Sequence, residues 1–131
     1  MICSTIGTPY EVEHNSNFIL LLEEVNEAPY CIHRLLSQLI LSNFINDHCK
    51  GIIIGYLSNV NNYSTSIEKQ LLESIVIELL EPLNIPLILG FPFGHNYPNL
   101  TLPIGCNTLF DSTSNKLIFL DNLLDEKKAS E

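Results

Sequence analysis

Apolar residues along the chain follow two alternating patterns, which predict strands and helices in turn. Short continuous apolar runs are typical of buried strands, and they cover residues 18–22, 50–57 and 85–89. Between them, apolar residues recur every three or four positions over residues 29–42 and 65–80, the spacing of amphipathic helices. Shorter strands follow in the last third of the chain. The order predicts an α/β fold with a mixed sheet and helices packed on it.

Polar residues and prolines set the expected helix boundaries. Asn26 is a candidate N-cap, with Glu27 and Pro29 in the first helical turn. Thr65 and Glu68 have the spacing of a capping box and should begin the second helix.

The two ends of the chain are less regular. Residues 101–109 and 116–120 are expected to form two further strands, joined by a turn at residues 111–115, and residues 122–131 should be a frayed tail. Near the start, residues 11–17 predict a polar loop in which His14 faces solvent. Ile2, Cys3 and Ile6 lack an evident apolar neighbour, so we expect them to form an exposed apolar surface.

Composition limits the class of protein. The 131 residues are 46% hydrophobic, which suits one domain over residues 1–131. The net charge is −9, and basic residues are few, so nucleic-acid binding is not expected. The start of the chain lacks the pattern of a signal peptide, and no apolar run is long enough to span a membrane. These features favour a cytoplasmic protein.

The four cysteines are widely spaced and form no pattern of metal ligands. We expect free thiols in a reducing compartment, with neither a metal nor another cofactor.

A loop rich in glycine and proline follows the third predicted strand and carries the strongest candidate for chemistry, His95. Gly94 precedes this histidine and allows a tight turn that leaves the imidazole unshielded. Open α/β sheets bind their ligands just beyond the carboxyl ends of their strands. An unperturbed imidazole titrates near pH ~6.5 and can serve as a general base. A surface histidine without a role is the alternative for an isolated Gly-His pair.

A histidine base needs a carboxylate that orients it, and the sequence offers three candidates. Glu23 ends a buried strand and is held more rigidly than a loop residue. Glu24 should point to the opposite face of that strand, since strand side chains alternate. Glu27 is the rival acid, although its position at a helix N-terminus also predicts a purely structural role.

Four segments, in order along the chain, resemble the C-terminal domain of the LD-carboxypeptidases, a family of serine peptidases that includes the microcin-immunity hydrolases. They cover about residues 4–120 and are Ile-Gly-Thr-Pro-Tyr (6–10), Leu-Leu-Leu-Glu-Glu-Val-Asn-Glu-Ala-Pro-Tyr (20–30) with Arg-Leu-Leu-Ser-Gln-Leu (34–39), Gly-Ile-Ile-Ile-Gly (51–55), and Gly-Phe-Pro-Phe-Gly-His (90–95) with Asn-Leu-Thr-Leu-Pro-Ile-Gly (99–105).

The resemblance implies a swivelling β/β/α domain that closes over a separate N-terminal nucleophile domain. It further implies that Glu23 and His95 are the acid and base of a Ser-Glu-His triad. Asn99 and Thr101 could position the histidine loop, and Arg34 could bind the substrate carboxylate, although an ion pair with Glu24 is an equal alternative. By resemblance, the substrate is a murein tetrapeptide, hydrolysed at its terminal L,D amide bond with release of D-alanine.

The nucleophile has no candidate in these residues, since no serine lies on a strand-to-helix elbow. We therefore expect the N-terminal nucleophile domain to be absent, and this chain alone to be inactive as a truncated half. Two hypotheses follow: the catalytic C-terminal half of an LD-carboxypeptidase that needs a serine domain as partner, or a non-catalytic remnant that binds a peptide or a partner. A homodimer is a further candidate assembly.

Overall fold

The computed structural model describes residues 1–58, 66–111, 113–114 and 116–121. The expected capping box at Thr65 and the expected tail at residues 122–131 lie outside this part of the chain.

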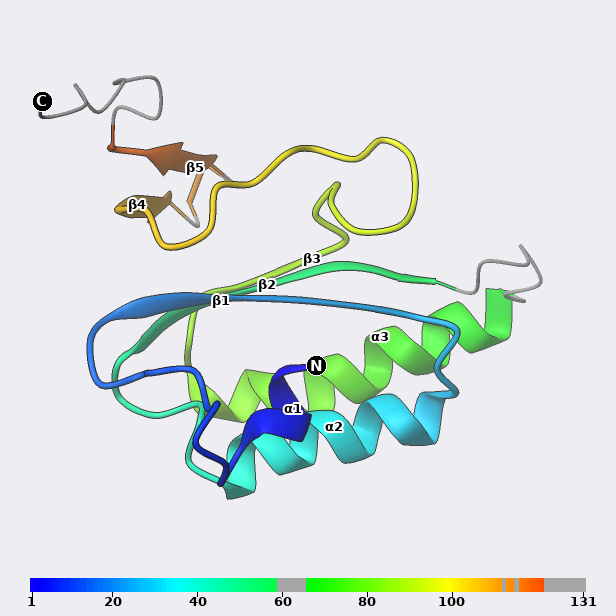
Figure 1. Ribbon diagram of the computed structural model, residues 1–131. Coiled ribbons are helices and arrows are strands. Elements are labelled where there is room, and N and C mark those ends of the chain that lie inside the picture. Colours follow the sequence, from blue (N-terminus) through cyan, green and yellow to red (C-terminus); the bar gives the residue numbers. More distant parts are fainter. Residues whose placement is uncertain (59–65, 112, 115, 122–131) are drawn as a thin grey trace, which may run out of the picture.

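A three-stranded parallel sheet forms the centre of the fold (Figure 1). Its strands are β1 (Phe18–Val25), β2 (Cys49–Ser58) and β3 (Leu87–Leu89), in the order β1-β2-β3. Each predicted apolar run therefore forms a strand. β1 extends to Val25, so Glu23 and Glu24 both belong to the strand.

Two helices link the strands and cover one face of the sheet (Figure 1). They are α2 (Pro29–Leu41) and α3 (Ser66–Leu80), and a short 3-10 helix, η1 (Glu81–Leu83), follows α3. Strand-helix-strand connections are right-handed, so sequential strand order places successive helices on the same face. Asn84 ends η1 in the left-handed region, with a φ of 53°.

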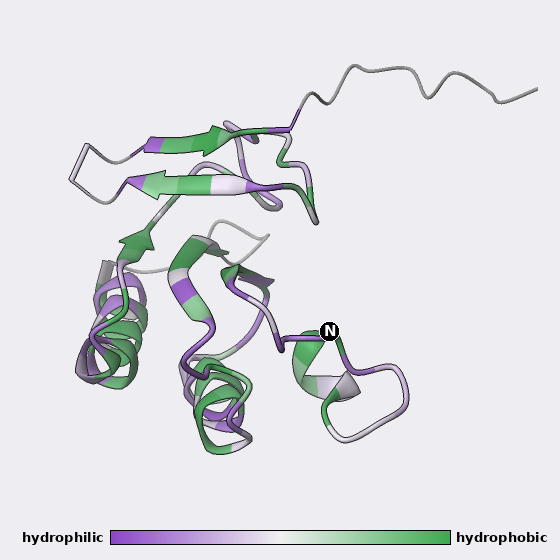
Figure 2. Cartoon of the chain, turned by 90° about the vertical axis from the view of Figure 1, so that its left-hand side faces the viewer, coloured by the Kyte–Doolittle hydropathy of each residue, from purple (hydrophilic) through white to green (hydrophobic). Residues whose placement is uncertain are grey.

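The core lies between this face of the sheet and the two helices. Each helix carries both apolar and polar residues, as Figure 2 shows, and buries its apolar side. Leu39 of α2 is 2% exposed, and Ile52 of β2 is fully buried. The remaining buried members of this cluster are Leu20, Ile32, Leu36, Phe44, Ile45, Cys49, Ile54, Val76 and Leu80.

The start of α2 differs from the expectation. Its N-cap is Ala28, whose side chain cannot form a capping hydrogen bond. Asn26 instead takes the left-handed conformation, with a φ of 63°, at the turn after β1. Glu27 precedes the N-cap and is not part of the first helical turn. Asparagine tolerates a positive φ better than most residues, which explains its use at this turn.

The N-terminal segment also corrects an expectation. Residues Ile2–Thr5 form a short helix, α1. Ile2, Cys3 and Ile6 pack against the core and do not form an exposed apolar surface, whereas Met1 is fully exposed. The apolar neighbours come from distant parts of the chain, which the local pattern could not reveal.

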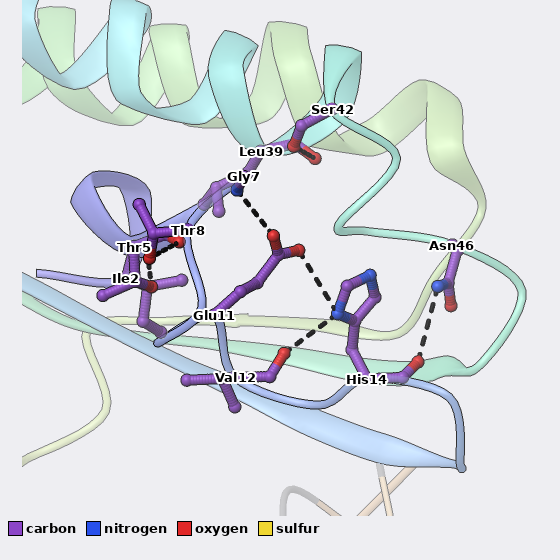
Figure 3. A network of polar contacts seen from close by, with 10 residues as sticks. All are labelled: Ile2, Thr5, Gly7, Thr8, Glu11, Val12, His14, Leu39, Ser42 and Asn46. Carbon is purple, nitrogen blue, oxygen red and sulfur yellow. Dashed lines mark hydrogen bonds and ion pairs between the residues drawn. The ribbon is translucent and has the colours of Figure 1, made fainter.

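A polar network fixes the loop between α1 and β1 (Figure 3). The backbone N–H of Gly7 donates to the Glu11 carboxylate at 2.6 Å. His14 Nδ1 lies 3.0 Å from the Val12 carbonyl oxygen and 3.8 Å from Glu11 Oε1. Its ring lies 4.6 Å from the ring of Phe44. His14 is therefore half-buried, and the expectation that it faces solvent is wrong.

A β-hairpin covers the other face of the sheet (Figures 1 and 2). It pairs β4 (Thr108–Asp111) with β5 (Lys116–Phe119) in antiparallel register. The Phe110 ring lies directly over Gly51 of β2, where any larger residue would meet it. The Phe110 ring therefore occupies the space that a side chain at position 51 would need.

The strand expected over residues 101–109 is mostly wrong. Residues 101–107 form loop and turn, and only the last two positions belong to β4. Pro103 lacks a backbone donor for a ladder, and Gly105 has a φ of 79°, which an extended strand cannot contain.

Candidate active site

A histidine and a glutamate from distant parts of the chain meet at the carboxyl end of the sheet. His95 Nδ1 lies 2.7 Å from Glu23 Oε1, and the backbone N–H of His95 donates to the same oxygen at 3.2 Å. Glu23 lies near the end of β1, and His95 lies on the loop after β3. The expected approach of a carboxylate to this ring is confirmed, with Glu23 as the partner.

The loop reaches Glu23 by crossing the end of β2, which lies between β1 and β3. Phe91 N–H donates to the Ile54 carbonyl oxygen at 3.0 Å, and Tyr56 N–H donates to the Phe93 carbonyl oxygen at 3.4 Å. The pairing of β1 with β2 is irregular at this place: Leu22 is opposite Ile54, whereas Glu24 is opposite Leu57. The extra residue of β2 lies where the strand binds the loop.

Two glycines make this close approach feasible. Gly94 has a φ of 110°, and a side chain there would collide with the Glu23 side chain. At Gly55, a Cβ atom would lie 2.7 Å from the Phe93 carbonyl oxygen. Glycine at these positions leaves room for the carboxylate on one side and for the loop on the other.

The two side chains differ in their exposure to solvent. The Glu23 side chain is 14% exposed, while the His95 side chain is 62% exposed. A carboxylate accepts hydrogen bonds, so the Nδ1–H group of a neutral His95 donates a hydrogen bond to Glu23, and Nε2 keeps a lone pair. Within the described part of the chain, Nε2 has no hydrogen-bond partner. The arrangement fixes the tautomer that a general base needs.

An apolar cavity of about 320 Å³ adjoins the pair. The ionisable side chains that line it are those of Cys3, Glu23, Glu24 and His95. Apolar side chains of the sheet and of the helices form the rest of its lining. Two carboxylates thus line a largely apolar space.

The other candidate acids do not reach the histidine. A Glu24 oxygen accepts a hydrogen bond from the Val25 N–H at 3.1 Å. Glu27 is exposed before α2 and makes no contact with His95 in the described residues. Arg34 is exposed on α2 and pairs with no carboxylate in the described residues, so the expected ion pair with Glu24 is absent there. Arg34 borders a shallow groove that also contains His33, Ser37 and Gln38, apart from the His95 loop.

Of the two residues expected to support the loop, one does so. The Asn99 side-chain oxygen accepts a hydrogen bond from the Gly94 N–H at 3.3 Å. Thr101 is exposed, and its side chain makes no hydrogen bond within the described residues. Sequence reasoning missed Gly55 and Tyr56 as parts of the site, because their contacts with Phe93 join segments far apart in the chain.

Two thiols have shifted acidities, and all four cysteines are unpaired. Burial raises the pKa of both the Cys3 and the Cys49 thiols.

In the described part of the chain, no cluster of His, Cys, Asp or Glu has the arrangement of a metal site. Nor does any helix there have the length and apolarity needed to cross a membrane.

Comparison with known proteins identifies the domain. Residues 1–109 match the family model described as the LD-carboxypeptidase C-terminal domain. The chain is 30% identical over 113 residues to a Bacillus subtilis (strain 168) protein named "Probable murein peptide carboxypeptidase", covering 86% of this chain and 34% of that protein. It is 27% identical over 122 residues to the Escherichia coli microcin C7 self-immunity protein MccF, covering 93% of this chain and 34% of MccF.

Solved structures agree with these matches. Muramoyltetrapeptide carboxypeptidase from Oxalobacter formigenes aligns with a TM-score of 0.70 at 29% identity, covering 89% of this chain and 40% of that protein. Wild-type MccF without ligand aligns with the same score at 25% identity, covering 92% of this chain and 35% of MccF. The chain spans about a third of the length of these curated relatives. Its mixed α/β fold and its matched residues show that this chain belongs to the LD-carboxypeptidase family and represents that family's C-terminal domain.

Proposed function

We propose that this domain supplies the acid and the base of a Ser-Glu-His triad that hydrolyses the terminal L,D amide bond of murein tetrapeptides and releases D-alanine. The single observation that carries the proposal is the 2.7 Å contact between His95 Nδ1 and Glu23 Oε1. The names of two relatives, a murein peptide carboxypeptidase and a muramoyltetrapeptide carboxypeptidase, support the choice of substrate.

In the proposed reaction, His95 Nε2 takes the proton of a serine hydroxyl as the serine oxygen attacks the amide carbon. The Glu23 carboxylate stabilises the imidazolium that forms, and the imidazolium then protonates the departing amine of D-alanine. Water, deprotonated by the same imidazole, hydrolyses the acyl-serine ester. The serine and the oxyanion-binding amides would come from a nucleophile domain outside these 131 residues.

The proposal is tested by supplying that domain. The N-terminal domain of the Bacillus subtilis relative would be combined with this chain, either as two polypeptides or as one fusion, and D-alanine released from muramoyl tetrapeptide would be measured. We expect release from the combination and none from either part alone, because a base without a nucleophile does not cleave an amide. Release by this chain alone would contradict the proposed division of the triad.

Variants then assign the roles. His95→Ala should reduce the rate by about 10⁴- to 10⁶-fold, and Glu23→Gln by about 10⁴-fold, as for members of other catalytic triads. His48→Ala and Glu13→Gln are matched controls, because both side chains are exposed and neither has a side-chain partner in the described residues. An active combination that tolerates His95→Ala would overturn the assignment of the base.

The alternative proposal is a non-catalytic domain that binds a peptide or a second copy of itself. The same assay separates the two: a folded, correctly associated combination without D-alanine release favours the non-catalytic role. A cytoplasmic location also remains part of the proposal, since murein recycling takes place there in the family that this chain resembles.

A further inference from the structure

The peptide bond between Phe93 and Gly94 is held from both of its sides. Its carbonyl oxygen, on Phe93, accepts the Tyr56 N–H of β2 at 3.4 Å. Its N–H, on Gly94, donates to the Asn99 side-chain oxygen at 3.3 Å. One contact comes from the sheet and the other comes from the loop itself, so the orientation of this single peptide plane is fixed by two independent partners.

This peptide plane directly precedes the contacts between His95 and Glu23. The next N–H along the chain, that of His95, donates to Glu23 Oε1 at 3.2 Å, and the His95 ring contacts the same oxygen at 2.7 Å. Gly94 is the hinge between the held peptide and these two contacts. A rotation of the 93–94 peptide would turn the Gly94 N–H away from Asn99 and move the His95 backbone relative to the carboxylate.

Gly94 cannot provide this rigidity itself. Its φ of 110° and its close contact with Glu23 require glycine. Glycine, however, is the residue with the widest range of accessible backbone angles, so this position is also the one most free to rotate. The constraint on the backbone at Gly94 must therefore come from other residues. The Tyr56 N–H and the Asn99 side chain are the groups that hydrogen-bond to the 93–94 peptide, which precedes the Gly94 Cα.

We propose that Asn99 is a positioning residue, which holds the 93–94 peptide so that the His95 imidazole stays on the Glu23 carboxylate. The effect of this role on catalysis rests on the proposed function, whereas the structural role of Asn99 does not. Asn99 would act as a hydrogen-bond acceptor only, so aspartate can replace it and alanine cannot.

The test uses NMR of the isotope-labelled chain in four forms: unaltered, Asn99→Ala, Asn99→Asp and Asn96→Ala. Asn96 is the matched control, an asparagine of the same loop without a side-chain partner in the described residues. The first readout is hydrogen exchange at the Gly94 amide. The second is the proton on His95 Nδ1, whose signal reports the contact with Glu23.

Asn99→Ala should speed exchange at Gly94 by about three- to tenfold, the effect of losing one ordinary hydrogen bond. It should also broaden or remove the His95 Nδ1 proton signal. Asn99→Asp should restore both readouts, and Asn96→Ala should change neither. An unchanged Nδ1 signal in Asn99→Ala would overturn the proposal, whether or not Gly94 loses protection. Failure of Asn99→Asp to restore the signal would equally overturn the acceptor role.

An activity measurement in the combination with the nucleophile domain separates positioning from substrate binding. A positioning role predicts a lower kcat with little change in KM for Asn99→Ala, together with the altered NMR signal. A lower rate without any NMR change would instead make Asn99 a substrate contact and overturn the proposal. If the unaltered combination releases no D-alanine, the proposed function fails, while the NMR comparison still decides the role of Asn99.

Discussion

At the scale of single residues, the site depends on one backbone position as much as on its two ionisable side chains. Gly94 supplies both a positive φ and the space that the Glu23 carboxylate occupies. A methyl group at this position would push the carboxylate away from the His95 ring. The sequence could identify Glu23 and His95 as candidates, because Glu23 follows an apolar run, His95 lies on the glycine-rich loop after another, and both match motifs of the family. It could not predict the collision between residue 94 and Glu23, because these residues are 71 positions apart in the chain.

We therefore predict that Gly94→Ala removes the His95 Nδ1 signal and, in the combination with a nucleophile domain, the activity. It should also destabilise the domain by about 1–3 kcal/mol, the cost of an alanine held at a positive φ. Gly105→Ala is the control, since Gly105 has a φ of 79° but has open space around its Cα. The control should share the loss of stability and keep the Nδ1 signal. Urea denaturation and NMR would measure the two effects, and equal loss of the signal in both variants would show that backbone strain, and not the collision, matters.

At the scale of elements, the sequence predicted what depends on local periodicity and missed what depends on contacts. The three parallel strands and the helices α2 and α3 follow from apolar runs and from three- and four-residue spacing. The helix bounds agree with the expectation within one residue, whereas β1 ends three residues later than expected and β3 begins two residues later. The strand expected from residue 101 fails, because its apolar residues occupy a loop shaped by Pro103 and Gly105. The N-cap of α2 lies two residues after the expected Asn26, because the chain uses Asn26 for a turn.

The β4–β5 hairpin should respond to acid, because carboxylates fix both of its ends. Hydrogen bonds from Ser114, and then from Thr113, hold the pKa of Asp111 below its ordinary value of 3.8. Bonds from the Asn107 side chain and backbone do the same for the pKa of Asp121. A lowered pKa means that the ionised form is favoured in the folded hairpin. The stabilisation is therefore complete above the ordinary pKa and is lost as the pH falls through the lower value of the folded state.

We predict that the hairpin loosens below about pH 3.8 while the central sheet stays folded. An acid titration monitored by the NMR signals of the Asn107 and Phe119 amides would measure this change. Asp121→Asn removes the titrating group at the open end, so the Asn107 amide should lose most of its pH dependence. Asp47→Asn is the control, because Asp47 is exposed and its side chain has no partner in the described residues. An Asn107 amide that titrates equally in both variants would contradict this explanation.

At the scale of the whole molecule, the core and the contact between His95 and Glu23 lie on different faces of the same sheet, although core residues also line the cavity beside the pair. The core lies between the sheet and the two helices, whereas the His95 loop and the hairpin lie beyond the opposite face (Figure 1). The carboxyl end of β1 joins the two, since Leu20 and Glu23 belong to one strand. Leu39 lines the cavity beside the pair, but the hydrogen bond between His95 and Glu23 involves no core residue. We therefore expect loss of core packing on the helical face to change the stability of the domain before it changes the geometry of the pair.

Leu39 and Leu41 of α2 allow this separation to be measured. Leu39 is 2% exposed within the core, whereas Leu41 is 86% exposed two residues later. Leu39→Ala should reduce the free energy of unfolding by about 2–5 kcal/mol, because it removes buried methyl groups and leaves a cavity. Leu41→Ala makes the same chemical change on the surface and should cost less than about 0.5 kcal/mol. Urea denaturation would give both values, and the His95 Nδ1 signal should persist in both variants below the unfolding transition. If Leu39→Ala abolishes that signal in the folded state, the packing of the helical face and the geometry of the site are coupled, and the two faces do not act independently.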